Sequence, residues 1–150
     1  MQGAMPRPIH IYSISLNFMN ILLKIHLNFI SVWYGDSMSD YLFEKEKARL
    51  LYKSLKPVFC PALQDWVYFN DHGFRHILVK NNRTRPKSDQ IRRFRLLPSA
   101  RKVISMATAY VYRQGKQDAS FWSVSNGRVK ILIRQINNGQ KHFFSIMDWT

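Results

Sequence analysis

Apolar side chains recur about every 3.6 residues over residues 41–55, and this spacing predicts a helix that ends before Pro57. Residues 66–70 are aromatic and β-branched and predict a strand, which the turn-forming residues 71–73 would end. The same reasoning predicts a short helix over 74–80, a polar loop over 81–87 and a basic helix over 91–97. A basic continuation over 99–107 is predicted to begin with Pro98 in its first turn.

Beyond Thr108 the period of the apolar positions changes from a helical one to two, which is the period of a half-buried strand. Strands are predicted over residues 109–114, 120–125, 128–137 and 140–148. Helices followed by an antiparallel sheet make an α+β domain. We expect the N-terminal helices to pack on one face of this C-terminal sheet.

Two Asn-Gly pairs, Asn126-Gly127 and Asn138-Gly139, separate the last three strands. Asn-Gly is the strongest short signal for a two-residue type I′ hairpin turn, because both central residues need a positive φ. Two such turns would set the register of the strands. Trp122 would face Ile131 and Arg134 would face Phe143.

This register divides the side chains of the last three strands between two faces. The predicted core face carries Trp122, Val124, Val129, Ile131, Ile133, Phe144 and Ile146, with His142 beside them. The predicted open face carries Phe121, Ser123, Ser125, Lys130, Leu132, Arg134, Lys141, Phe143, Ser145 and Met147. An ordinary solvent-exposed face has such a mixture too, but rings beside cations are also what stacking on bases and pairing with phosphates require.

The N-terminal part of the chain differs from the rest. Residues 9–34 are apolar and long enough to cross a bilayer, but Lys24 near the middle would make a membrane span costly. The composition changes at Met38, where charged residues begin to alternate with apolar ones. We expect a folded domain over residues 38–150 and a spurious or poorly ordered extension over 1–37, with a membrane anchor as the alternative.

The net charge of the chain indicates which kind of molecule it binds. The chain has 23 Lys and Arg against 9 Asp and Glu, a net charge of +14 and a pI near 10.3. Residues 38–150 alone keep a net charge of +13. Such an excess attracts a polyanion, and nucleic acid is the commonest one, although an anionic membrane satisfies the same electrostatics.

A single cysteine, Cys60, excludes an intrachain disulfide and a zinc site built from several cysteines. This cysteine usage is typical of a reducing, cytoplasmic environment. Cys60 lies between Phe59 and Pro61 with no base beside it, so we interpret it as a buried structural thiol.

His76 is the candidate for acid–base chemistry. It lies four residues before Lys80 on the predicted helix, and residues four apart share a helix face, so both side chains could reach one phosphodiester. A structural histidine that packs on the sheet is the alternative interpretation.

Several of these segments together resemble a known family. They are a Gly-x-x-His-Ile signature at residues 73–77, an Arg-x-x-Leu-Leu-Pro helix at 93–98, and a closing pair of strands that carries Ser145. Over residues 67–147 the chain resembles the phage-associated branch of the barnase, EndoU, colicin-type and RelE-like nucleases. The resemblance implies a barnase/RelE-like fold and a metal-independent ribonuclease, often a toxin of a phage or mobile element.

The resemblance implies a functional role for three residues. His76 matches the family histidine, Arg134 a cation on a strand, and Ser145 a late hydroxyl. We expect His76 to act as base or acid, Arg134 to clamp the phosphate and Ser145 to orient it, with no cofactor and no metal. No second histidine is well placed in the predicted register, which leaves the acid–base pair incomplete.

Further contacts to nucleic acid are expected from Arg75, Lys80, Arg92, Lys130, Lys141 and Phe143. RNA is the predicted partner, and an acidic antidote protein would complement a basic toxin. The carboxylates of the domain are scattered singly, which does not favour a two-metal nuclease. Two alternatives remain: a non-catalytic module that binds RNA or DNA, and a protein that residues 1–37 hold at a membrane.

Overall fold

The computed structural model describes residues 35–149. The compact unit that carries the fold begins at Glu44, within helix α2 (Gly35–Ser54). The predicted extension, residues 1–37, therefore lies almost entirely outside the described residues. Between residues 35 and 149, no helix is both long and apolar enough to cross a membrane.

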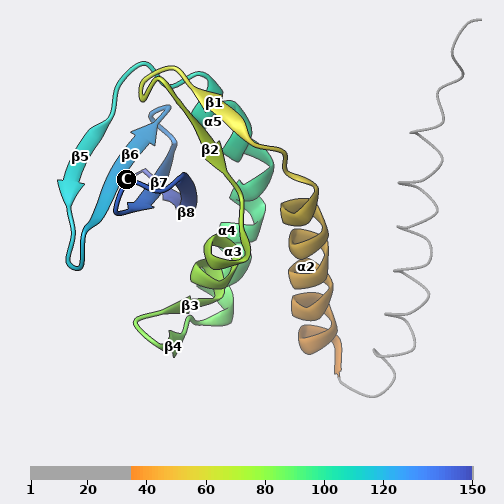
Figure 1. Ribbon diagram of the computed structural model, residues 1–150. Coiled ribbons are helices and arrows are strands. Elements are labelled where there is room, and N and C mark those ends of the chain that lie inside the picture. The colour runs from red at the N-terminus through yellow and green to blue at the C-terminus, as the bar shows by residue number, and fades with distance from the viewer. Residues whose placement is uncertain (1–34, 150) are drawn as a thin grey trace, which may run out of the picture. The chain divides into compact units, whose positions relative to one another are not determined.

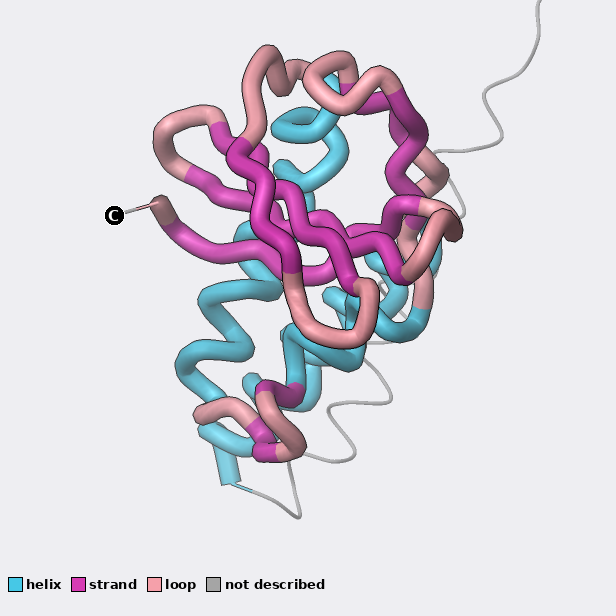
Figure 2. The backbone as a smooth tube through the Cα atoms, turned by 60° about the vertical axis from the view of Figure 1, so that its left-hand side comes forward, coloured by secondary structure: helices cyan, strands magenta, loops and turns pink. Residues whose placement is uncertain are grey.

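Most of the strands form one twisted sheet (Figures 1 and 2). In spatial order they are β1 (Val58–Cys60), β2 (Asp65–Tyr68), β8 (Lys141–Asp148), β7 (Val129–Ile136), β6 (Ala119–Ser125) and β5 (Val111–Gln114). Neighbouring strands are antiparallel, except that β2 and β8 run parallel. The predicted α+β class with a mostly antiparallel sheet is confirmed.

The helices between β2 and β5 differ from the prediction at their ends. They are α3 (Asp71–Leu78), α4 (Lys87–Leu96), a 3₁₀ turn (Leu97–Ser99) and α5 (Ala100–Ser105). The predicted turn at residues 71–73 is the first turn of α3, because the Asn70 side chain accepts a hydrogen bond from the Gly73 N–H (3.2 Å). The helix predicted over 91–97 begins earlier, at Lys87, and its continuation begins with a 3₁₀ turn that contains Pro98, as predicted, and ends at Ser105.

A tight hairpin lies where a polar loop was predicted. Strands β3 (Val79–Lys80) and β4 (Arg83–Thr84) pair antiparallel, and only Asn81 and Asn82 separate them. Both asparagines have positive φ, 51° and 61°, as a type I′ turn requires. This hairpin directly follows α3 (Figure 1).

The main core lies where α5 packs on β1, β6 and β7. Ile104 of α5 and Ile131 and Ile133 of β7 are fully buried. At the other end of the sheet, Tyr52 of α2 packs its ring against Phe143 and donates a hydrogen bond to the Asn70 carbonyl (2.9 Å). These contacts define the covered face of the sheet.

The first Asn-Gly turn is displaced from the predicted position. Ser125 pairs with Lys130, and Trp122 pairs with Ile133 instead of Ile131. The reason is that the Asn126 side chain accepts hydrogen bonds from the N–H groups two and three residues later, so Asn126 begins the turn and does not sit at its centre. The register moves by two residues, and each side chain therefore stays on its predicted face.

The second Asn-Gly pair does not form the predicted type I′ turn, because the positive φ (50°) belongs to Asn137, before the pair. In β8 the side chains next to this turn lie on the opposite faces from those predicted, because the strand contains a bulge. Leu132 pairs with Ser145, but the next residue of β7, Ile133, pairs with Phe143, so Phe144 has no partner. The predicted placement of Phe143 and Phe144 is wrong: Phe143 lies in the core and is 0% exposed, and Phe144 lies on the open face.

The same bulge reverses two more predicted placements. His142 pairs with Arg134 on the open face, whereas it was predicted on the core side. Lys141 was predicted on the open face, but its ammonium group lies over the ring of Trp122 and forms an ion pair with Asp65 (2.6 Å). One extra residue thus exchanges every side chain between the bulge and the turn.

The bulge predicts unequal losses of stability for two neighbouring phenylalanines. Phe143→Ala should lower the free energy of unfolding by about 3–5 kcal/mol, because it leaves a cavity in the core. Phe144→Ala should cost clearly less, since Phe144 is partly exposed. Urea denaturation of the two variants measures the difference. A larger loss for Phe144→Ala would mean that the strand is regular and that Phe144 faces the core.

Candidate active site

A groove of about 940 Å³ runs along the open face of the sheet. Strands β5 to β8 form its floor, and residues of α3, of the β3–β4 hairpin and of α4 form one wall. No lining residue is acidic, and six are cationic: Lys80, Arg85, Arg93, Arg113, Lys116 and Lys130. A concave surface with this charge concentrates anions.

Gly73 lets α3 approach the sheet closely enough to bring His76 to this groove. A Cβ atom at Gly73 would lie only 2.3 Å from the hydroxyl oxygen of Tyr52 and 2.4 Å from the carbonyl oxygen of Phe143. The Gly-x-x-His pattern therefore needs a glycine at its first position, because any side chain there would clash with Tyr52 and Phe143. One turn later, the His76 ring packs on the Phe144 ring with a centroid separation of 3.8 Å.

His76 is neutral at pH 7 when no anion is bound in the groove. Its pKa falls from 6.5 to about 4, first because burial disfavours the charged imidazolium and then because Arg85, Arg93, His72 and Lys80 repel it. The Nδ1 atom is buried and has no hydrogen-bond partner among the described residues. A buried ring nitrogen without a partner is uncommon in a purely structural histidine.

Arg134 lies on the open face, as predicted. Its Cζ atom is 5.4 Å from the centre of the Phe144 ring and 5.9 Å from that of Phe121. His76 contacts the same Phe144 ring, so the centre of the His76 ring lies within about 9 Å of Arg134 Cζ. The two side chains are close enough to serve one phosphodiester.

His142 is the residue that sequence reasoning placed on the wrong face. It lies opposite Arg134, and its ring centre is 6.2 Å from that of Tyr68. Burial first, and the neighbouring His72 second, lower its pKa below the usual 6.5. Its Nδ1 atom also has no hydrogen-bond partner among the described residues. The bulge thus supplies the second histidine that the predicted register lacked.

Ser145 does not present a free hydroxyl to the groove. The residue is among those that line the groove but is only 1% exposed, and its hydroxyl oxygen accepts a hydrogen bond from Arg93 Nη1 (2.9 Å). The same nitrogen donates to the Ile146 carbonyl at the edge of β8 (2.5 Å). Ser145 therefore anchors Arg93, and its role as an orienter of substrate stays a prediction.

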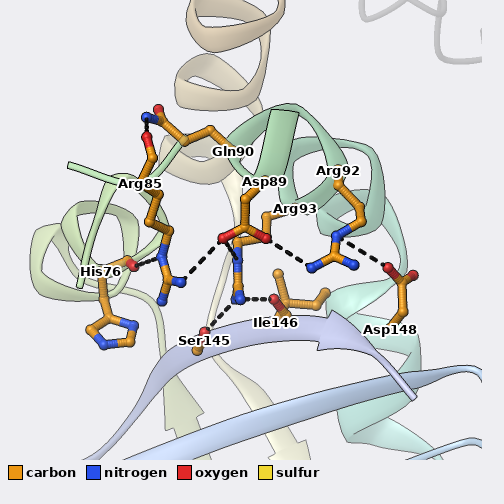
Figure 3. Close-up of polar contacts among 9 residues, drawn as sticks. All are labelled: His76, Arg85, Asp89, Gln90, Arg92, Arg93, Ser145, Ile146 and Asp148. Carbon is orange, nitrogen blue, oxygen red and sulfur yellow. Dashed lines mark hydrogen bonds and ion pairs between the residues drawn. The ribbon is translucent and has the colours of Figure 1, made fainter. Parts of the chain in front are cut away.

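Arg93 belongs to a network around Asp89 (Figure 3). The Oδ2 atom of Asp89 accepts one hydrogen bond from Arg85 Nη1 and one from Arg93 Nε, each at 3.2 Å. The Oδ1 atom accepts from Arg92 Nη2 (2.8 Å). Arg85 also donates to the His76 carbonyl (3.2 Å), which links the network to α3. Sequence spacing does not indicate Arg85 as a site residue, because the hairpin that positions it was predicted as a loop.

The structure brings three of the predicted nucleic-acid contacts to the site. Lys80 and Lys130 both line the groove, Lys130 from β7 and Lys80 from β3. The prediction that Lys80 shares a helix with His76 is wrong, because α3 ends at Leu78. Arg75 is exposed and lines a smaller pocket beside His76 and His72. Their positions are compatible with backbone phosphate contacts.

Three other predicted contacts do not meet in the groove. Arg92 is paired with Asp89 and, at 3.4 Å, with Asp148. Lys141 lies on the core side of the sheet in its pair with Asp65. Phe143 is fully buried and cannot stack on a base.

The residues that the structure describes contain no group of three or more His, Cys, Asp or Glu side chains placed to hold a metal ion. Comparison of the chain with protein-family models, with curated proteins and with solved structures finds no match.

Proposed function

We propose that the protein is a metal-independent endoribonuclease with the arrangement of a barnase/RelE-like domain. The observation that carries this proposal is the placement of His76 and Arg134 on the Phe144 ring, with His142 paired opposite Arg134, beside a cationic groove. Two imidazoles and a guanidinium can supply the base, the acid and the positive charge with which RNA is cleaved by its own 2′-hydroxyl.

His76 acts as the base in this proposal, because its lowered pKa keeps it neutral and able to accept a proton at pH 7. It removes the 2′-hydroxyl proton, and the 2′-oxygen attacks phosphorus. Arg134 stabilises the negative charge that develops on the phosphoryl oxygens. A bound phosphate also offsets the repulsion from Arg85 and Arg93, so the pKa of His76 rises towards neutrality once substrate is present.

His142 acts as the acid and protonates the 5′-oxygen as the bond from phosphorus to that oxygen breaks. The products are a 2′,3′-cyclic phosphate and a free 5′-hydroxyl. His142 lies directly opposite Arg134, so the phosphate clamp and the acid come from adjacent strands. Protonated His142 is also favoured by the negative charge of the substrate, as for His76.

The proposal extends to the biological setting that the family resemblance implies. A toxin of a phage or mobile element, acting in the cytoplasm and held by an acidic antidote protein, fits the net charge of +14 and the acid-free groove. The buried free thiol of Cys60 is compatible with a reducing compartment.

Incubation of the full-length chain with a single-stranded RNA oligonucleotide in EDTA tests the proposal. We expect cleavage to continue in the chelator and the 5′ fragments to end in a 2′,3′-cyclic phosphate. An oligonucleotide of the same sequence with 2′-deoxyribose throughout should remain intact, since it lacks the nucleophile. Cleavage of the deoxy strand, or loss of RNA cleavage in EDTA, would contradict the mechanism.

A non-catalytic nucleic-acid-binding module is the second candidate, favoured by the groove's cations and by the Phe121 and Phe144 rings on its floor. Such a module would bind RNA and DNA alike, with an affinity that falls steeply with salt, and would cut neither.

A further inference from the structure

Arg85 and Arg93 carry more positive charge than the one carboxylate that they contact, Asp89, can balance. Both side chains are more than nine-tenths buried, with 9% and 7% of their residue surface exposed. They share a single carboxylate oxygen of Asp89, whose other oxygen is already occupied by Arg92. Two buried cations share part of one carboxylate, so the site keeps a net positive charge. Burial of an unbalanced charge is unfavourable unless an anion binds beside it.

The free donors of this pair lie at the groove. Arg85 uses Nε and Nη1, and Arg93 uses Nε and Nη1, in the hydrogen bonds formed among residues 35–149. The Nη2 group of each arginine is left without a partner among those residues. Figure 3 shows both guanidinium groups between Asp89 and strand β8, on the side where His76 and Ser145 lie. Two forked donors at one place match the oxygens of a phosphate.

This pair is separate from the place where the phosphodiester is proposed to be cleaved. Arg93 contacts β8 at Ser145, whereas Arg134 faces β8 at His142, three residues earlier. Because of the bulge, β7 spans the same interval with only two residues, from Leu132 to Arg134, which corresponds to roughly 7 Å. The Phe144 ring lies between the two positions, with His76 packed on it.

We propose that Arg85 and Arg93 form a second phosphate-binding subsite, which holds a backbone phosphate of the RNA strand next to the one that is cleaved. The inference rests on the proposed function in taking RNA as the ligand. The strand then crosses the Phe144 ring, with one phosphate at Arg134 and a neighbouring one at the arginine pair. Binding there also neutralises the charge that disfavours protonation of His76.

Inorganic phosphate tests the subsite without any cleavage. We expect phosphate, but not chloride at equal ionic strength, to shift the imidazole NMR signals of His76 saturably and to raise its pKa from about 4. Arg85→Gln should weaken phosphate binding between about tenfold and a hundredfold. Arg95→Gln, on an exposed position of α4, removes the same charge and should leave binding unchanged. An equal response to chloride, or full binding by Arg85→Gln, would overturn the inference.

Cleavage of short substrates tests the position of the subsite. A dinucleoside monophosphate has only the phosphate that is cut, whereas a trinucleotide extended on the 5′ or the 3′ side has one more. One of the two trinucleotides should have a kcat/KM at least about tenfold above that of the dinucleotide, and Arg85→Gln should remove this advantage. If neither extension helps, or if the advantage survives in Arg85→Gln, the subsite is wrong even though RNA is cut.

The phosphate-binding subsite can still be tested if a variant is unstable or if RNA is not cleaved. If Arg85→Gln lowers the melting temperature too far for assay, Arg85→Lys keeps the charge but loses the fork, and should weaken phosphate binding by a smaller factor. If RNA is not cleaved at all, the proposed function fails, while the phosphate titration still decides whether the subsite exists.

Discussion

His76→Gln should lower the rate of RNA cleavage by about 10²–10⁴-fold, the usual contribution of a general base. Glutamine keeps a polar side chain on the Phe144 ring but cannot accept the proton of the 2′-hydroxyl. The protein should remain folded, because the His76 side chain is only half-buried and its Nδ1 makes no hydrogen bond with the described residues. The measurement is the initial cleavage rate of a fluorescent RNA oligonucleotide in EDTA.

The matched control is His72→Gln, one turn earlier on the same face of α3, where the side chain is exposed. That variant should cleave RNA within a few-fold of the unmodified protein. Equal activity of His76→Gln and His72→Gln would remove His76 from the mechanism and favour a different base. If no variant and no parent protein cleaves RNA, while all of them bind it, the non-catalytic module is the better description.

The pH dependence of the parent protein gives a further readout of the same residue. The pKa of His76 is lowered, so the neutral base persists as the pH falls below 6.5 and is lost only near 4. The acid limb of kcat/KM, which reports the free protein, should therefore lie near pH 4. An acid limb at the ordinary histidine value would mean that the active base is a more exposed group.

His142→Gln should cause a loss of similar size, about 10²–10⁴-fold, on an ordinary RNA substrate. The reason is that the 5′-oxygen of a nucleoside is a poor leaving group and needs a proton as it departs. The loss should be much smaller on a nucleoside 3′-(4-nitrophenyl phosphate), because nitrophenolate leaves without protonation. Release of nitrophenolate, followed by absorbance, measures this difference directly.

His76→Gln serves as the comparison in that experiment, because the base is needed whichever group leaves. It should stay defective on the activated substrate while His142→Gln recovers. Equal defects of the two variants on both substrates would exclude the assignment of His142 as the acid. Full activity of His142→Gln on RNA would mean that the bulge brings His142 to the open face without using it.

The amino-acid pattern determined the class of the fold and the existence of β2 and β5 to β8, because aromatic and β-branched runs and alternation with a period of two can be read locally. It did not indicate the short strands β1, β3 and β4. It also put Arg134 on the open face: the displaced first turn moved the register by an even number of residues. The excess of cations likewise follows from composition alone, and the structure gathers six of them along one groove.

The bulge shows where local pattern was insufficient. Phe143 and Phe144 are adjacent and equally apolar, so either one satisfies the core and the pattern does not distinguish the two registers. The tertiary structure decides between them, since only one of the two rings can pack against Tyr52 at the close approach of Gly73. That choice moves His142 beside Arg134 and takes Lys141 away from the open face.

The arginine network was also decided by tertiary structure. Arg93 reaches Ser145 across 52 positions of sequence, and Arg85 reaches the His76 carbonyl only because Asn81 and Asn82 turn the chain back on itself. Periodicity specifies which face of its own element a side chain occupies, because that depends on neighbours a few residues away. Which charges then share a carboxylate depends on how separate elements pack, and this is why Asp89, Arg85 and Arg93 emerged only from the folded chain.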